Sequence, residues 1–452
     1  MKIKFLGAAG TVTGSKYLLE SSKGTKILID CGLFQGVKNL RLRNWQEFPI
    51  PINSITAIIL THAHIDHSGY IPKLVQRGFN KLIYCTPATK ALAEILLEDS
   101  AYIKEEEAEY ANYKHFSKHH PALPLYTKQD VAQSLPLFRE KNYNENFEIQ
   151  DFKICFLPAG HILGASSVLI ECDGKKILFS GDLGRENDLL MKAPSPPPEC
   201  DYLILEGTYG DRLHEKIDPI LALENLIKQI KHDKSILMIP SFAVGRAQLL
   251  LYCVHQVFRR DPSLQMPVFI NSPMANQVTD LYQKFKDEHR LDEKTTANFL
   301  KTGFFIRSIE ESKQLNKSHG PMIIIAASGM LAGGRILHHL DSFGSDPKNK
   351  ILMVGFQAPG TRGANLLRGE KQIKFHGFYH EINAQVLNMD FFSAHADQRE
   401  LIQWAKLINP KPQKIIITHA EPESADTLRR RLVEELDLKV QVAEDLETIN
   451  LE

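Results

Sequence analysis

The sequence predicts an α/β protein in which one domain is interrupted by a second, inserted α/β domain. Two observations support this prediction. Short runs of β-branched residues that end abruptly in His, Asp or Glu stop near residue 207 and resume after residue 380. Between them, strand-like and helix-like segments alternate, which is typical of a doubly wound sheet. We therefore expect three segments, 1–207, 208–380 and 381–452, of which the first and third form one domain.

The strand-like runs of the outer domain each carry a polar residue at or just beyond their end. They read KILIDCG, AIILTHAH, CFLPAGH, KILFSGD, YLILEGTYG and KIIITHAEP. Buried strands that stop at such residues indicate a sheet that presents polar groups along one edge. In the inserted segment each strand precedes a helix instead, as SILMIP precedes FAVGRAQLLLYCVHQVF and PVFIN precedes SPMANQVTDLYQKF.

Composition and charge limit the class of protein. Of the 452 residues, 43% are hydrophobic and 24% are charged, which is typical of a globular chain and not of a disordered one. Lys+Arg and Asp+Glu both total 54, so the net charge is zero and any nucleic-acid site must be local. The six cysteines form no Cys-x-x-Cys pair, so they indicate neither a thiolate zinc site nor a disulfide framework, and they fit a cytoplasmic protein. No apolar run is long enough to predict a membrane helix.

The stretch THAHIDHSGY, residues 61–70, crowds three imidazoles and a carboxylate into one turn. His62 and His64 stand two residues apart at a strand end, so their side chains emerge on one side, while Asp66 and His67 continue around the turn. The alternative is an accidental polar turn, but four such groups would then need costly mutual satisfaction or full exposure. Two zinc ions need about seven or eight ligand contacts, and this motif supplies four of them.

The missing ligands are expected at the ends of other strands. His161, Asp182 and His419 each stand where a strand-like run stops, and a carboxylate such as Asp182 can bridge two ions. Any one of them taken alone is more often a cap or a surface group than a ligand. Together with the histidine-rich turn they favour a binuclear metal site.

These motifs resemble the metallo-β-lactamase superfamily, whose hallmark is His-x-His-x-Asp-His followed by a His, an Asp and a His. Within it, the chain is most similar to the β-CASP group of RNA-processing nucleases, and among these to short bacterial members similar to the cleavage and polyadenylation endonuclease. The further motifs of that group match Glu206 in LEGTYGDRLH, His395 in FFSAHADQ and His419 in THAEPES. The resemblance implies an αββα metallo-β-lactamase sandwich with an inserted, doubly wound β-CASP domain.

The resemblance also implies roles for individual residues. One ion would be held by His62, His64, His161 and Asp182, and the other by Asp66, His67, Asp182 and His419, giving two Zn²⁺ per chain. Asp30 would support the ligand turn without touching metal. Asp66, Glu206 and His395 would be the catalytic residues, with His395 protonating the leaving oxygen and Glu206 orienting that imidazole.

Loops of the inserted segment supply candidate contacts to the RNA backbone. PSFAVGRAQ, AASGMLAGGR and QAPGTRG stand at strand-to-helix transitions, where backbone N–H groups can cradle phosphates. An equally good interpretation is that their glycines only shape turns and their arginines pair with surface acids. The candidate RNA-binding residues are Ser241, Arg246, Ser328, Arg335, Arg362 and Ser393.

We therefore expect a zinc-dependent ribonuclease that cuts single-stranded RNA internally, and the sequence leaves open whether it also cuts from the 5′ end. The alternatives are a β-CASP nuclease acting on DNA, a thioester or lactone hydrolase of the same superfamily, and a non-catalytic scaffold that has lost its ligands. The full-size insert and the motifs around Glu206 and His395 argue against a small-ester hydrolase, and the intact ligand motifs argue against a scaffold. We expect the protein to bind single-stranded RNA and not to associate with a membrane. The sequence leaves homodimer formation open.

Overall fold

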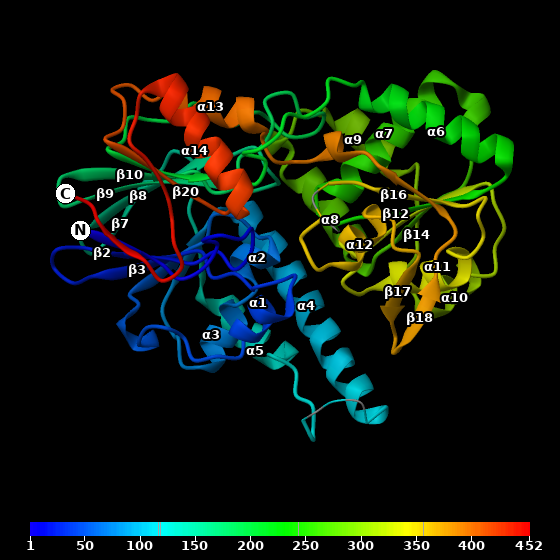
Figure 1. Ribbon diagram of the computed structural model, residues 1–452, viewed down its shortest axis with the longest axis horizontal. Helices are drawn as coiled ribbons and strands as arrows, with labels where there is room; N and C mark the ends of the chain where they lie inside the picture. The colour runs from blue at the N-terminus through cyan, green and yellow to red at the C-terminus, as the bar shows by residue number, and fades with distance from the viewer. Residues whose placement is uncertain (116, 118, 243, 356) are drawn as a thin grey trace. The chain divides into compact units, whose positions relative to one another are not determined.

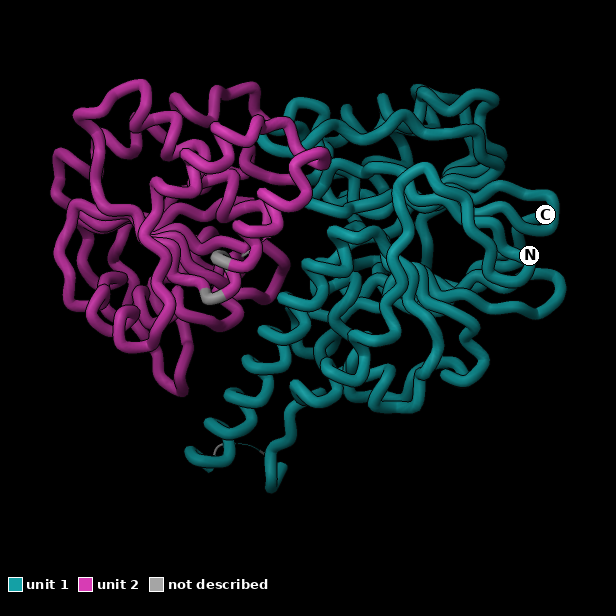
Figure 2. The backbone as a smooth tube through the Cα atoms, turned by 180° about the vertical axis from the view of Figure 1, so that it is seen from behind, with its two compact units in different colours: residues 1–213, 395–452 teal, residues 214–394 magenta. Residues whose placement is uncertain are grey.

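The computed structural model describes residues 1–115, 117, 119–242, 244–355 and 357–452. The chain divides into two compact units, residues 1–213 with 395–452 and residues 214–394 (Figure 2). These divisions differ from the boundaries expected at 207/208 and 380/381. Strand β19 (Gln385–Asn388) pairs with the sheet of the second unit, and Gly210 packs against the backbone of Ser424 in the first unit, so each boundary lies later in the chain.

The first unit contains two seven-stranded mixed sheets, as the α/β sandwich requires. The first sheet has the order β22-β1-β2-β3-β4-β5-β6, in which β3 to β6 run parallel and so end at one edge. The short β-branched runs of the sequence form its central strands. Its strands are β22 (Thr448–Asn450), β1 (Lys2–Phe5), β2 (Tyr17–Glu20), β3 (Lys26–Ile29), β4 (Ala57–Ile59), β5 (Ile83–Cys85) and β6 (Phe138–Glu140).

The second sheet has the order β21-β20-β11-β10-β9-β8-β7. Its strands β10, β11, β20 and β21 are parallel, so the residues that follow them gather at one edge of the sheet. Its strands are β21 (Val440–Val442), β20 (Lys414–Thr418), β11 (Tyr202–Glu206), β10 (Lys175–Phe179), β9 (Ser166–Cys172), β8 (Phe152–Pro158) and β7 (Asn146–Ile149).

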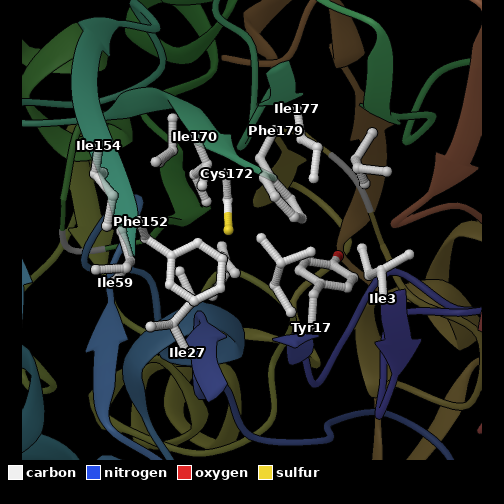
Figure 3. Packing of buried hydrophobic residues seen from close by; sticks show 14 of the residues in the cluster. Ile3, Tyr17, Ile27, Ile59, Phe152, Ile154, Ile170, Cys172, Ile177 and Phe179 are labelled. Carbon is white, nitrogen blue, oxygen red and sulfur yellow. The ribbon is translucent and has the colours of Figure 1, made fainter. Parts of the chain in front are cut away.

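A hydrophobic core joins the two sheets. Ile27 and Ile59 project from the first sheet, and Phe152, Ile170 and Phe179 project from the second (Figure 3). None of these five side chains is more than 2% exposed. Burying a side chain of this kind contributes roughly 1.5–3 kcal/mol, so the interface between the sheets fixes the edge at which the polar strand ends lie.

Helices cover the outer sides of this sandwich (Figure 1). Helix α4 begins after Thr86, whose hydroxyl accepts from the Thr89 N–H, and α13 begins with a capping box between Asp397 and Glu400. In the described part of the chain, no helix has the length and apolar character that crossing a membrane requires. The helices are α1 (Lys38–Arg43), α2 (Ile65–Ser68), α3 (Ile71–Gln76), α4 (Pro87–Tyr113), α5 (Lys128–Ser134), α13 (Gln398–Lys406) and α14 (Pro422–Leu436), with short 3₁₀ turns η1 (Ile52–Ser54) and η2 (Leu135–Leu137).

The second unit is built on a six-stranded parallel sheet of order β14-β13-β15-β12-β16-β19, which confirms the expected inserted α/β domain. The chain starts at β12, inside the sheet, and adds strands on one side before the other. Its strands are β12 (Ile236–Pro240), β13 (Val268–Asn271), β14 (Phe304–Phe305), β15 (Met322–Ala326), β16 (Lys350–Met353) and β19, beside a hairpin of β17 (Gln372–Phe375) and β18 (Phe378–Glu381).

Its helices follow the strands as the alternating pattern predicts. They are α6 (Pro219–Asp233), α7 (Arg246–Arg260), α8 (Pro273–Lys284), α9 (Glu293–Leu300), α10 (Ile309–Leu315), α11 (Arg335–Phe343) and α12 (Arg362–Leu367), with 3₁₀ turns η3 (Pro262–Leu264), η4 (Lys286–Glu288) and η5 (Asp390–Phe392).

Candidate metal centre

The histidine-rich turn is held by a buried carboxylate at the end of β3. Asp30 is 1% exposed and has a left-handed backbone, which an Asp tolerates well. Its carboxylate accepts from the Thr61 N–H at 2.8 Å and the Thr61 hydroxyl at 2.9 Å, and its Oδ2 lies 2.8 Å from Nδ1 of His67. Because Nδ1 of His67 faces this carboxylate, its Nε2 is left to face the other ligand groups.

Four side chains converge on one point beside this turn. His62 and His64 follow β4, His161 follows β8 and Asp182 follows β10. Nδ1 of His64 lies 3.2 Å from Nε2 of His62 and 3.1 Å from Nε2 of His161. Oδ2 of Asp182 lies 3.4 Å from Nε2 of His62 and 3.6 Å from Nε2 of His161. These four residues are thus arranged as one candidate metal-binding group.

A second group lies on the other side of Asp182. Nε2 of His67 is 3.2 Å from Nε2 of His419, which in turn is 3.4 Å from Oδ2 of Asp66. Oδ1 of Asp182 is 3.3 Å from Nε2 of His67, so the two oxygens of this carboxylate face different groups. The carboxylate of Asp182 thus lies between the two groups.

The spacing of the donor atoms fits zinc. Ligand bonds of roughly 2.0–2.2 Å in a tetrahedron place the donor atoms about 3.3–3.6 Å apart. The four donor–donor distances given above for the first group run from 3.1 to 3.6 Å, and all its ligand atoms lie within 4.8 Å of one another. Oδ1 of Asp182 and Nδ1 of His161 are buried without a hydrogen bond to any described residue, and leaving a buried carboxylate oxygen unsatisfied is costly unless a cation compensates it.

Burial keeps the imidazoles of the first group neutral, as metal binding requires. Burial, together with the charge of His67, lowers the pKa of His62. Burial and His62 lower the pKa of His64 to about 3. Burial and His395 lower the pKa of His161 well below its usual value.

The charges of the second group act in the opposite direction. Although burial opposes ionisation, His419, His67 and His62 hold the pKa of Asp182 well below its usual value. Burial also opposes protonation of His67, but Asp182 and Asp30 outweigh it and raise the pKa of that imidazole well above its usual value. The carboxylates therefore draw positive charge to this side of the centre, where a metal ion would displace protons.

Glu206, which was expected to orient the imidazole of His395, lies beside that residue at the rim of the centre. Oε1 of Glu206 is 3.2 Å from Nδ1 of His395 and also accepts from the Leu183 N–H at 2.7 Å. The main chain of His395 forms a β-bridge with Gly184, and this bridge fixes the backbone position from which the imidazole side chain extends. The Glu206 side chain is 1% exposed and that of His395 is 16% exposed, so the imidazole alone can reach an incoming group.

Two threonines in the site were not expected from the sequence. The Thr208 hydroxyl donates to Oε2 of Glu206 at 2.5 Å and lies 3.1 Å from Nδ1 of His419. The Thr61 hydroxyl lies 3.1 Å from Nδ1 of His62 besides bonding to Asp30. Their positions next to predicted ligands and motif residues were the only signal in the sequence. They tie the expected side chains into one hydrogen-bonded network.

The residues expected to contact RNA lie in the second unit and are engaged within it. Arg335 donates to Oδ1 of Asn271 at 2.6 Å, and Arg362 donates to the carbonyl oxygens of Lys374, Leu331 and Ala332. These partners are an amide oxygen and backbone carbonyl oxygens, whereas the alternative interpretation expected the arginines to pair with surface carboxylates. The remaining four candidates are Ser241, Arg246, Ser328 and Ser393, of which Ser241 and Ser393 are 1% and Arg246 is 8% exposed. Ala243, in the same loop as Ser241, lies outside the described residues.

Comparisons with known families agree with this geometry. The chain matches the metallo-beta-lactamase superfamily over residues 9–220, the Beta-Casp domain over residues 247–366, and the Zn-dependent metallo-hydrolase RNA specificity domain over residues 379–443.

Relatives of the chain match it over nearly its whole length. It is 36% identical to Ribonuclease TTHA0252 of Thermus thermophilus, with 96% of each chain covered. It is 30% identical to cleavage and polyadenylation specificity factor 73 of Drosophila melanogaster, over 97% of this chain and 62% of that one. It is 32% identical to an RNase J-like protein of Methanocaldococcus jannaschii, over 93% and 92% of the two chains. A crystal structure of a protein of unknown function from Enterococcus faecalis shares the fold with a TM-score of 0.55 at 15% identity, over 100% and 99% of the chains.

Proposed function

The chain belongs to the metallo-β-lactamase superfamily, in the group that carries β-CASP and RNA-specificity domains, and we propose that it is a binuclear zinc ribonuclease that hydrolyses single-stranded RNA. The observation that carries the proposal is that Asp182 belongs to the first ligand group through Oδ2, while its Oδ1 lies 3.3 Å from Nε2 of His67 in the second. The intact ligand set argues for an enzyme over a scaffold.

We assign the first ion to His62, His64, His161 and Asp182, and the second to Asp66, His67, Asp182 and His419. When bound, zinc supplies Lewis acidity that activates water near neutral pH and offsets charge on phosphate oxygens. Asp182 holds the two groups together, and Asp30 keeps Nε2 of His67 free by occupying its Nδ1.

His395 acts as the general acid for the leaving oxygen. Its Nδ1 faces Oε1 of Glu206, so Nε2 is the nitrogen from which the proton leaves. The buried Glu206 carboxylate fixes the plane of the ring and compensates the imidazolium charge before transfer. The oxygen that we propose His395 protonates is the 3′ oxygen, as the family resemblance implies, and its departure leaves the phosphate on the 5′ end of the downstream fragment.

RNA is favoured over DNA by the match to an RNA specificity domain over residues 379–443 and by relatives that are named ribonucleases. A thioester or lactone hydrolase would have no use for His395 and Glu206 at the rim of the centre. We also propose that the protein acts in the cytoplasm, since all six cysteines are free and buried.

The test puts wild-type protein and His395→Ala on matched 5′- and 3′-labelled single-stranded RNA and DNA, with zinc measured on the same samples. We expect wild type to cut RNA, and His395→Ala to lose at least about 10²-fold in rate while keeping about two zinc ions per chain. Light scattering on these samples tests homodimer formation. If zinc-loaded wild type leaves RNA intact, the ribonuclease proposal fails, and cleavage of DNA on the same gel identifies the alternative substrate.

A further inference from the structure

One exposed surface of the first unit combines positive charge with an exposed indole. Helix α1 and the turn after it place Lys38, Arg41, Leu42 and Trp45 at helical spacing on one face, and Lys73 joins them with its Nζ 5.8 Å from the centre of the Trp45 ring. We call these five residues the α1 patch. Leu42 is 49% exposed and Trp45 is 50% exposed, so two large apolar side chains three residues apart lie at this surface among basic residues.

The charge of the α1 patch is unbalanced. Residues 36–47 include three basic residues, Lys38, Arg41 and Arg43, and one acidic residue, Glu47, so this segment has a net charge of +2 in a chain whose total charge is zero. Arg43 pairs with Asp445 at 2.7 Å, but no described carboxylate forms an ion pair with Lys38 or Arg41. Lys38 and Arg41 therefore lie at the surface without a carboxylate partner among the described residues, where they can attract an anion.

The α1 patch is fixed to the metal centre through the main chain. The buried Asn44 side chain accepts from the Phe34 N–H at 3.0 Å and donates to the Phe34 carbonyl at 2.8 Å. One residue earlier, the Leu33 N–H donates to the carbonyl of Ile65 in the ligand turn at 2.9 Å. A polymer held on the α1 patch is therefore held in a fixed position relative to the ligand turn.

We propose that the α1 patch binds the substrate's single strand outside the scissile bond, with a base stacked on Trp45 and phosphates held by Lys38, Arg41 and Lys73. This inference rests on the proposed function, because it names where the same substrate is gripped. An exposed indole near cations that have no carboxylate partner among the described residues suits an unstacked base and its backbone, whereas paired bases would offer the indole no face; Lys73 would exchange its hydrogen bond to Gln76 for a phosphate. A protein partner would have to be acidic to match the same charges.

The test uses the His395→Ala background, so that RNA is bound and not consumed, and a labelled single-stranded RNA of mixed sequence. Trp45→Ala is expected to weaken binding by about 5- to 150-fold, the effect of losing one base stack. The double variant Lys38→Gln, Arg41→Gln is expected to lower the salt dependence of log Kd by about 1.4, or 0.7 for each phosphate contact. The matched control Lys406→Gln, Lys439→Gln removes two exposed cations of the same unit and is expected to change neither quantity.

Two readouts separate this inference from the proposed function. Hydrolysis of the small diester bis(p-nitrophenyl) phosphate, measured with His395 intact, does not need the α1 patch and is expected to match wild type in the Trp45→Ala variant. Quenching of Trp45 fluorescence by RNA is expected, whereas Trp404 is buried. If wild type neither binds nor cuts RNA, the proposed function fails. If wild type cuts RNA but the variants of the α1 patch bind it as the control does, this inference fails. Binding of poly-glutamate, a probe for an acidic protein partner, is measured on the same variants. If they lose poly-glutamate binding but keep RNA binding, the surface is assigned to an acidic protein instead.

Discussion

Replacing Asp30 by Asn exchanges one carboxylate oxygen for an NH₂ group and should weaken the binding of one metal ion. The Asp30 carboxylate accepts three hydrogen bonds, two from Thr61 and one from Nδ1 of His67. If the amide oxygen of the introduced Asn still accepts the hydrogen bond from the Thr61 N–H, its NH₂ group faces Nδ1 of His67. The imidazole must then accept at Nδ1 and carry its hydrogen on Nε2, which faces Asp182 and His419. A protonated Nε2 cannot bind zinc.

The size of the effect follows from the same contacts. If the Asn turns the other way, its NH₂ meets the Thr61 N–H in a buried site, and an unsatisfied buried donor costs about 1–3 kcal/mol. Loss of a carboxylate that orients a ligand histidine typically lowers metal affinity by about 10- to 100-fold. We therefore expect the affinity of the second zinc ion to fall by about 10- to 100-fold, with the first ion unchanged. The backbone should tolerate the change, because Asn readily adopts the left-handed conformation that Asp30 has.

The assay is zinc titration of the Asp30→Asn variant against a chromogenic chelator, with circular dichroism to establish folding. Asp188→Asn is the matched control, because the Asp188 carboxylate also accepts two backbone N–H bonds, at 2.7 and 2.8 Å, and its amide oxygen would retain them. Two zinc sites of unchanged affinity in folded Asp30→Asn would refute the tautomer argument and with it the role given to Asp30.

Three further predictions address the surroundings of the centre. Gly32→Ala would place its Cβ 1.5 Å from the carbonyl oxygen of Asp66, so the ligand turn must move. The number of zinc ions per chain, measured by plasma mass spectrometry, should then fall towards one. Two zinc ions per chain in the variant would contradict this. Burial lowers the pKa of Lys16 from 10.5 to about 8, so the unfolded chain binds one more proton at this group between these values, and the contribution of Lys16 to stability should rise by on the order of 3 kcal/mol as pH increases through that window. In urea unfolding of the zinc-free protein, the free energy of unfolding of wild type should therefore rise relative to that of Lys16→Met over this window, and parallel pH profiles would disprove it. Glu206→Gln should keep both zinc ions but lower RNA cleavage by about 10²-fold or more, since His395 loses its carboxylate; an unchanged pH–rate profile would remove Glu206 from the mechanism.

Local patterns in the sequence were sufficient for the elements that stand close together in the chain. The run of His62, His64, Asp66 and His67 lies at a strand end, and the periodicity of the flanking residues places that strand. The strand-then-helix order of residues 236–260 likewise predicts β12 and α7. Local geometry fixes such features because side-chain directions repeat with the period of the element.

The domain boundaries could not be obtained from local patterns. Strand β19 belongs to the second unit because it pairs with β16, and nothing within residues 385–388 indicates that partner. Residues 208–213 look like the start of the insert, but Thr208 bonds to His419 and the backbone at Gly210 packs on Ser424. Pairing between distant segments depends on the whole sheet and not on the segment itself.

The sequence by itself determined the chemistry of this protein: which residue types could hold metal, that they stand at strand ends, and that an α/β domain interrupts them. Only the tertiary structure decided how these groups meet. It directs the two oxygens of Asp182 to different ligand groups, occupies Arg335 and Arg362 within their own unit, and leaves Trp45 exposed near basic side chains. The physical reason is that residue type and spacing set what a side chain can do, whereas burial and long-range pairing set what it faces.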